Sequence, residues 1–165
     1  MSEKKIALIT GATSGIGEST SFELANQFSL IICGRNKDKL DELSNELSKK
    51  TNVKTLEFDV RDKEDVREKI SSLSDDWKNI DILINNAGNA HGLDFIHEGK
   101  ISDWDMMIDT NVKGLLYVSK YVLDIMIENN RGHIVNIGSI AGKEVYPKGN
   151  IYCCLLYTSP SPRDQ

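Results

Sequence analysis

The sequence predicts an α/β fold, a doubly wound parallel sheet, from three observations. Continuous apolar runs of strand length alternate with segments whose apolar residues recur at helical spacing. The first apolar run, residues 6–9, enters a glycine-rich turn at 10–17 that leads into a helix. Small and polar residues follow each later run. Alternating strands and helices of this kind build a sheet that helices cover on both faces, with a ligand crevice at the carboxyl ends of the strands.

Five strands are expected, each apolar throughout because both of its faces would be buried. They cover residues 6–9, 30–33, 53–58, 80–84 and 132–137. The fifth is the last strand that the sequence contains, so the predicted sheet is truncated there.

The helices between these strands carry recognisable signals. The first is expected over 16–27, with a buried side formed by Phe22, Leu24, Ala25 and Phe28. Asn36 and Asp62 are placed to cap the next two helices. The longest helical pattern spans 102–128, and its apolar stripe is wide enough to pack against the sheet and a second partner, such as another subunit.

Composition excludes several classes of protein. The 165 residues, 39% hydrophobic and 27% charged, suit one soluble domain with a buried core. The net charge of −5 argues against a nucleic-acid or anionic-membrane partner. No apolar run approaches the ~20 residues of a membrane span, and no signal-peptide pattern follows Met1. Cys33, Cys153 and Cys154 form no disulfide or metal pattern, so we expect a cytoplasmic protein without a metal site.

The glycine-rich turn suits the binding of a diphosphate. Gly11 can adopt the tight turn, while Gly15 and Gly17 let the backbone approach a ligand and the helix pack on its strand. The N–H groups at the start of the helix would then face the phosphates. The spacing is G-x-x-x-G-x-G and not the commoner G-x-G-x-x-G, so an ordinary strand–helix connection remains the alternative.

Five motifs along the chain resemble those of the classical short-chain dehydrogenase/reductase family. They are T-G-x-x-x-G-I-G at 10–17, N-N-A-G at 85–88, Asn111 in the long helix, Ser139 after the fifth strand, and Tyr152 thirteen residues later. The resemblance implies a Rossmann-like nucleotide-binding domain over residues 1–153. Segments 77–82 and 146–152 resemble the subgroup that oxidises 3-hydroxy acids, such as serine or allo-threonine, with NADP.

The resemblance and the strand ends together predict the cofactor-binding residues. They are Gly11, Thr13, Ser14, Gly15, Ile16, Gly17, Arg35, Asp59, Val60, Asn85, Ala87 and Gly88. The guanidinium of Arg35 would lie at the adenosine ribose and suits a 2′-phosphate, which favours NADP over NAD. The rival is Asp38, which would favour NAD but falls in the first turn of a helix, where an acid is favoured by the dipole.

Two cofactor-binding residues have specific expectations. Asp59 either accepts a hydrogen bond from the adenine amine or serves only as a turn residue before the next helix. Asn85 is expected to bond to neighbouring backbone at the end of its strand and so hold the sheet. Ala87 and Gly88 would leave room for the cofactor.

The resemblance implies three catalytic residues. Ser139 would donate a hydrogen bond to the substrate oxygen, and a simple turn residue is the alternative. Asn111 would open its helix locally and hold a water in a proton relay, and an exposed polar position is the alternative. Tyr152 would be the general acid/base, for which a nearby cation must bring a phenol pKa of ~10 closer to neutrality.

The family pattern fails after Tyr152. It requires a lysine four residues later, one helical turn away, and position 156 is Leu; Lys148 lies on the wrong side. Residues 154–164 resemble the in-frame translation of a transposase adapter used in preparing sequencing libraries. We therefore expect residues 154–165 to be a non-native tail, and the native chain to continue for roughly another hundred residues.

The predicted function is that of the complete parent protein. It is an NADP-dependent oxidoreductase that transfers a hydride between nicotinamide and a small hydroxy or keto substrate, as a homodimer or homotetramer. The chain as given would be inactive without the lysine, and the unpaired edge of its fifth strand predicts aggregation. The alternatives are a non-catalytic dinucleotide-binding or sensor module, and a reductase of 3-oxoacyl-carrier substrates.

Overall fold

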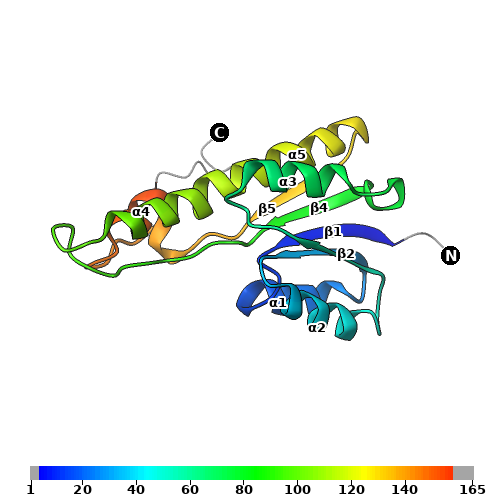
Figure 1. Ribbon diagram of the computed structural model, residues 1–165, viewed down its shortest axis with the longest axis horizontal. Coiled ribbons are helices and arrows are strands. Elements are labelled where there is room, and N and C mark those ends of the chain that lie inside the picture. The colour runs from blue at the N-terminus through cyan, green and yellow to red at the C-terminus, as the bar shows by residue number, and fades with distance from the viewer. Residues whose placement is uncertain (1–3, 158–165) are drawn as a thin grey trace.

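The computed structural model describes residues 4–157, in which strands and helices alternate (Figure 1). The elements are β1 (Lys5–Thr10), α1 (Gly15–Leu24), β2 (Phe28–Gly34), α2 (Lys37–Leu47), β3 (Val53–Glu57), α3 (Lys63–Ser71), the 3₁₀ turn η1 (Asp75–Trp77), β4 (Ile80–Asn85), α4 (Ile101–Ile108), the π-helical segment η2 (Asp109–Gly114), α5 (Leu115–Glu128), β5 (His133–Asn136), the 3₁₀ turn η3 (Ile140–Gly142) and α6 (Asn150–Tyr157).

The described strands form one parallel sheet in the order β3-β2-β1-β4-β5. The chain moves outward from β1 to β3, then crosses back and continues on the other side of β1 with β4 and β5. The strand order therefore reverses between β1 and β4, which is where doubly wound sheets bind their ligands. The predicted α/β fold is confirmed.

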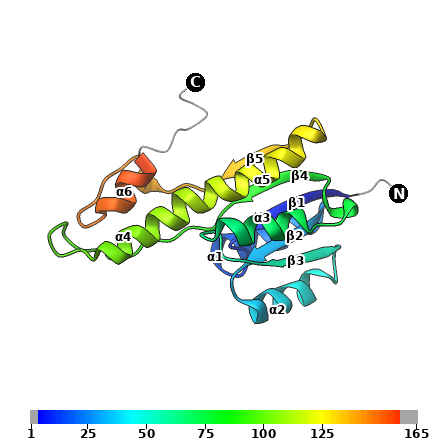
Figure 2. The same cartoon turned by 45° about the horizontal axis from the view of Figure 1, so that its top comes forward.

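Helices cover both faces of this sheet. Figure 1 and Figure 2 show α1 and α2 on one face and α3 and α5 on the other. Strand β1 contributes to both cores, because Ala7 and Ile9 pack on the α1–α2 side while Ile6 and Leu8 pack on the α3–α5 side. Burial on both faces explains the unbroken apolar run, and each large side chain buried there stabilises the fold by about 1.5–3 kcal/mol.

Both predicted helix caps are confirmed. The Oδ1 atom of Asn36 accepts a hydrogen bond of 3.0 Å from the backbone N–H of Lys39 at the start of α2. The Oδ1 atom of Asp62 accepts from the N–H groups of Glu64 and Asp65 at 3.0 and 3.1 Å, at the start of α3. These bonds satisfy backbone donors that have no partner within the helix.

The first helix is shorter than the sequence predicts. α1 ends at Leu24 and not at residue 27, and Phe28 belongs to β2 and not to the buried side of the helix. The reason is pairing in the sheet, since Phe28 lies in register with Lys5 of β1 and so starts the second strand two residues early. A turn closed by a 3.0 Å bond from Gln27 N–H to the Leu24 carbonyl separates helix and strand.

The long helical pattern forms one helical run through α4, η2 and α5, and its apolar stripe divides into two parts. Val122 and Met126 are buried in the core on the α3–α5 side of the sheet, as predicted, and Met107 is buried in α4. Leu116 and Ile127 remain 57% and 70% exposed, on the outer side of α5. The contact of this outer side with a second partner stays a prediction.

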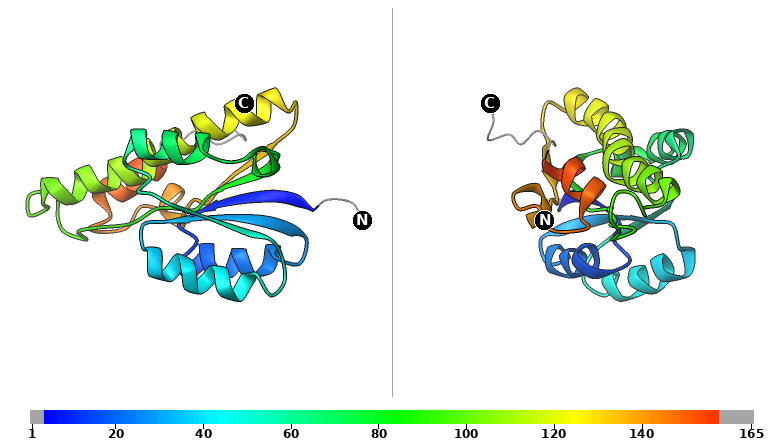
Figure 3. Two further views of the ribbon diagram at one scale, coloured as in Figure 1. Left: turned by 45° about the vertical axis from the view of Figure 1, so that its right-hand side comes forward. Right: turned by 90° about the vertical axis from the view of Figure 1, so that its left-hand side faces the viewer.

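The last helix, α6, contacts α4 beyond the end of the sheet, as Figure 3 also shows. It runs to Tyr157, so Cys154 and the three residues after it continue the helix that begins at Asn150. Residues 158–165 of the expected tail lie outside the described residues, and the origin of 154–165 stays a prediction. In the described part of the chain, no helix is both long and apolar enough to cross a membrane.

Candidate functional site

A pocket of about 490 Å³ lies at the carboxyl ends of the central strands, where the strand order reverses. It collects residues from almost the whole chain. Of the predicted site residues, those that line it are Gly11, Thr13, Ser14, Ile16, Arg35, Asp59, Val60, Ala87, Gly88 and Tyr152. The predicted residues outside its lining are Gly15, Gly17, Asn85, Asn111 and Ser139.

The glycine-rich turn forms one wall of this pocket, and its glycines have separate structural reasons. Gly11 and Gly15 have φ angles of +63° and +56°, which favour glycine. A Cβ on Gly17 would collide with the carbonyl oxygen of Gly11 and the side chain of Asn86. Ser14 precedes α1 without a side-chain capping bond, so the first N–H groups of the helix remain available to an anion.

The prediction for Asn85 is wrong in detail. Its Nδ2 donates to side chains, namely Ser119 Oγ and Asn136 Oδ1, both at 2.9 Å, and not to neighbouring backbone. The bond to backbone comes from Asn86, whose Nδ2 donates to the carbonyl oxygens of Thr10 and Gly11 at 3.0 and 3.1 Å. Consecutive residues at a strand end point in opposite directions, so Asn85 faces α5 and β5 while Asn86 faces the glycine-rich turn.

Thr10 and Asn86 lie within the predicted motifs at 10–17 and 85–88 without a predicted role of their own, and both shape the site. The hydroxyl oxygen of Thr10 accepts from the N–H groups of Asn86 and Ala87, both at 3.0 Å. Together these bonds fasten the loop after β4 to the end of β1. A Thr as the last residue of β1, and a second Asn beside Asn85, were the available signals.

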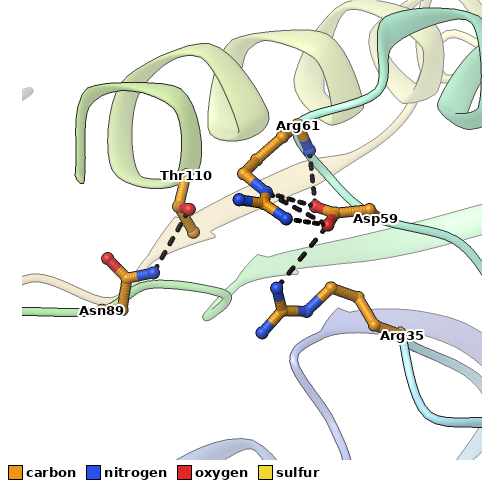
Figure 4. Close-up of polar contacts among 5 residues, drawn as sticks. All are labelled: Arg35, Asp59, Arg61, Asn89 and Thr110. Carbon is orange, nitrogen blue, oxygen red and sulfur yellow. Dashed lines mark hydrogen bonds and ion pairs between the residues drawn. The ribbon is translucent and has the colours of Figure 1, made fainter. Parts of the chain in front are cut away.

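Three charged residues gather at the ends of β2 and β3, as Figure 4 shows. Arg61 Nε lies 3.0 Å from both carboxylate oxygens of Asp59, and Arg61 Nη2 lies 2.6 Å from Oδ2. Arg35 Nη1 is 3.6 Å from the same Oδ2. Asp59 Oδ1 also accepts from the backbone N–H of Arg61 at 3.0 Å, which is the geometry of a turn residue.

This pairing decides the charge of Asp59. Partial burial by itself raises the pKa of the Asp59 carboxyl, but hydrogen bonds and charge from Arg61, with the charge of Arg35, outweigh burial and hold that pKa below its usual value. The same hydrogen bonds raise the pKa of the Arg61 guanidinium. Asp59 is therefore an anion between two cations. Its hydrogen bond to an adenine amine stays a prediction.

Arg35 and its rival Asp38 occupy different surroundings. Arg35 lines the pocket and its side chain is 64% exposed, so its guanidinium can still take a ligand. Asp38 is an exposed residue in the first turn of α2, outside the pocket lining. Among the charged residues close to β2, Arg35 is thus the one placed to meet a ligand.

Asn111 sits in the π-helical segment η2, where the long helix opens locally. Its Oδ1 accepts from the backbone N–H of Asn89 at 2.8 Å, and its Nδ2 donates to the Asn89 carbonyl at 2.8 Å. Asn89 Nδ2 also lies 3.3 Å from Thr110 Oγ1 (Figure 4). The alternative of an exposed polar position is therefore wrong, since Asn111 locks the loop after β4 onto the helix. Its water relay stays a prediction.

Tyr152 lines the pocket, and Ser139 directly follows Gly138, which also lines it. Ser139 Oγ accepts from the N–H of Ala141 at 3.2 Å and so caps η3, which leaves its hydroxyl hydrogen free to donate. Tyr152 lies in the first turn of α6 and lines the pocket. Leu156 stands one turn further along α6. The ammonium of Lys148 lies 5.1 Å from the ring centroid of Phe95, in a cation–π contact.

The remaining chemistry-bearing residues of the pocket do not form a metal site. Within residues 4–157, no group of three or more His, Cys, Asp or Glu side chains could hold a metal ion. Cys33 is buried, and desolvation raises the pKa of its thiol, so it remains protonated and belongs to the core as expected.

Comparison with known proteins agrees with this arrangement. The NADP-dependent 3-hydroxy acid dehydrogenase YdfG of Salmonella typhi is 46% identical over 148 residues, which is 89% of this chain and 59% of that protein. An NADP-dependent 3-hydroxy acid dehydrogenase of Schizosaccharomyces pombe is 43% identical over 153 residues, 90% of this chain and 59% of that protein. The chain thus spans about 59% of the length of these relatives.

Solved structures show the same likeness. The crystal structure of serine dehydrogenase from Escherichia coli superposes with a TM-score of 0.87 at 44% identity, over 92% of this chain and 70% of that one. A closed form of serine dehydrogenase complexed with NADP+ gives a TM-score of 0.86 at 44% identity, over 92% and 61%. The family model described as short chain dehydrogenase matches residues 5–154. This chain is therefore a member of the short-chain dehydrogenase family.

Proposed function

We propose that the protein is an NADP-dependent oxidoreductase that transfers a hydride between nicotinamide and a small 3-hydroxy acid. The observation that carries this proposal is one pocket whose lining combines the glycine-rich turn and Arg35 with Tyr152. The printed names of the relatives, which are NADP-dependent 3-hydroxy acid dehydrogenases, support the choice of cofactor and substrate class.

The pocket residues fit a dinucleotide. A Cβ on Gly15 would meet no protein atom within 4 Å, so the backbone at the start of α1 is open to a diphosphate. A Cβ on Gly88 would lie 3.2 Å from Asn111 Oδ1, a tight contact that a glycine avoids. Arg35 would bind the 2′-phosphate through its exposed guanidinium. The bound cofactor would supply or accept the hydride.

The predicted catalytic residues would donate and transfer the proton that accompanies hydride transfer. Ser139 would donate its free hydroxyl hydrogen to the substrate oxygen, whose charge changes during hydride transfer. Tyr152 would give or take the proton at its phenol oxygen. Asn111 would support the relay from the π-helical segment, where its amide already fixes the position of Asn89.

A second function is favoured by one residue. Leu156, one helical turn after Tyr152, supplies no cation to that face of α6, so the chain as given suits a non-catalytic dinucleotide-binding module. A reductase of 3-oxoacyl-carrier substrates is the third candidate, and a panel of substrates separates it from the hydroxy acids.

The first test compares binding with turnover. We expect the protein to bind NADPH more tightly than NADH, measured by quenching of protein fluorescence. Arg35→Ala should weaken NADPH binding about tenfold or more and leave NADH binding unchanged, because bonds to a charged partner contribute about 1.5–3 kcal/mol. Exposed Arg67→Ala is the control. An unchanged preference in Arg35→Ala would make the 2′-phosphate assignment wrong.

Turnover separates the two leading candidates. NADP+ reduction with serine, allo-threonine or 3-hydroxybutyrate in the protein extended to the length of its relatives would support the enzyme. Binding of NADPH without turnover of any of these substrates would support the binding module. We propose that the protein acts in the cytoplasm and forms a homodimer or homotetramer. The exposed apolar residues of α5 support the association of subunits.

A further inference from the structure

Arg61 is a charged residue near the pocket that the proposed function does not use. It lies outside the pocket lining, and its side chain is one-third exposed. Three of its nitrogen contacts to Asp59, at 2.6 to 3.0 Å, are within hydrogen-bond distance. The contact of Arg35 with the same carboxylate, at 3.6 Å, is longer than a hydrogen bond.

Two guanidinium groups therefore lie beside the Asp59 carboxylate, and only that of Arg61 forms hydrogen bonds with it. The hydrogen bonds from Arg61 reach both oxygens of the carboxylate, whereas Arg35 approaches one of them with a single nitrogen. A charge-assisted bidentate pair is the stronger arrangement. The N–H groups of the Arg35 guanidinium therefore remain available to bind another anion.

The charges point to the same conclusion. Arg35 and Asp59 alone would sum to zero and would offer an incoming anion little attraction. With Arg61 included the cluster carries a net charge of +1, from two guanidinium groups and one carboxylate (Figure 4). Asp109, at the start of η2, adds a negative charge near Arg61 but is itself paired with Lys113 at 2.8 Å.

We propose that Arg61 is a positioning residue that sets the preference for a 2′-phosphate, because it takes the hydrogen bonds of Asp59 and leaves Arg35 with only a 3.6 Å ion pair to that carboxylate. This proposal rests on the proposed binding of the 2′-phosphate by Arg35. Without Arg61, the carboxylate of Asp59 is free to form hydrogen bonds with Arg35 in place of the present 3.6 Å ion pair, and so competes with the phosphate. Arg61 itself touches neither the phosphate nor the reacting atoms.

The test uses two probes that differ only at the 2′ position, adenosine 2′,5′-bisphosphate and 5′-AMP, titrated calorimetrically into the full 165-residue chain. Arg61→Ala is expected to weaken binding of the bisphosphate about tenfold and to change binding of 5′-AMP less than twofold. Arg61→Gln removes the same charge with a smaller loss of packing. If Arg61→Ala fails to fold, Arg61→Gln must show the same weakening of bisphosphate binding.

Removal of Asp59 gives the decisive readout. Asp59→Asn in the Arg61→Ala background should restore the preference for the bisphosphate to within about twofold of the wild type, because the competing carboxylate is gone. A merely structural role of Arg61 would not be rescued in this way. The matched control is Arg67→Ala on α3, which removes one exposed cation that pairs with Glu64 at 2.8 Å and should leave both affinities unchanged.

The outcomes distinguish this proposal from the one on which it rests. A wild-type chain without preference for the bisphosphate overturns the NADP assignment itself. A wild-type preference that survives in the Arg61 variants overturns the role of Arg61 alone. Equal weakening of both probes, or failure of Asp59→Asn to restore the ratio, also overturns it.

Discussion

At the scale of single residues, the carboxylate of Asp59 connects cofactor preference with stability. It accepts hydrogen bonds through both oxygens from Arg61, and its side chain is only 26% exposed. Its lowered pKa means that the folded state holds the ionised form more readily than the unfolded state does. The stabilisation is present above the ordinary carboxyl pKa of about 4 and is lost as the pH falls through the lowered pKa.

Asp59→Asn should therefore reduce the free energy of unfolding by about 1 kcal/mol at pH 7 and by less at pH 3. Urea denaturation of both proteins across this range, followed by circular dichroism, measures the difference. Glu42→Gln, an exposed carboxyl on α2, is the control and should change stability little at either pH. A loss for Asp59→Asn that is equal at both pH values would contradict the charge argument.

At the scale of elements, the start of α1 shows how one turn combines packing with ligand binding. Gly17 is required for packing, because a Cβ there would collide with the backbone of Gly11 and the side chain of Asn86. Gly15 is required for its φ of +56°, and the space around it is open. Replacing Gly17 therefore causes a steric collision, whereas replacing Gly15 causes backbone strain.

Gly17→Ala should reduce the free energy of unfolding by about 3 kcal/mol, since the backbone of Gly11 cannot move aside without displacing β1. Gly15→Ala should cost about 1 kcal/mol, the strain of a side chain in the left-handed region. Chemical denaturation of the matched pair measures both values. Equal losses would show that the contact of α1 with the loop after β4 does not depend on Gly17.

The π-helical segment η2 of the long helix also shapes the site. The π-helical segment between α4 and α5 places Thr110 and Asn111 against the loop after β4, and both bond to Asn89. An uninterrupted α-helix would rotate these side chains away from the loop. The opening of the helix therefore holds the loop after β4 against Thr110 and Asn111.

At the scale of the whole molecule, two surfaces of the described residues lack a covering layer. Strand β5 is the last strand at one side of the sheet, and its residues are exposed or half-buried. The outer side of α5 exposes Leu116, Leu123 and Ile127, which recur on one helical face. An uncovered strand edge and an apolar helix face both favour association with another chain.

We expect the 165-residue chain to self-associate at micromolar concentration. Ile127→Glu and Leu116→Glu should each lower the average mass measured by light scattering after gel filtration, because a charge in the apolar face opposes association. Glu42→Gln, on the other face of the sheet, should leave the mass unchanged. A monomeric wild-type chain would contradict the prediction and leave these surfaces without an interface role.

The fold class and the neighbourhood of the site could be predicted from the sequence. Apolar runs and helical spacing decide which residues are buried, and residues at the ends of parallel strands meet at one edge in any sheet of this class. The tertiary structure alone decided which atoms meet there. The backbone bonds expected of Asn85 are made by Asn86 instead, and Asp59 is bonded to Arg61 as well as paired with Arg35. Such contacts join residues distant in the chain and depend on side-chain directions that periodicity does not encode.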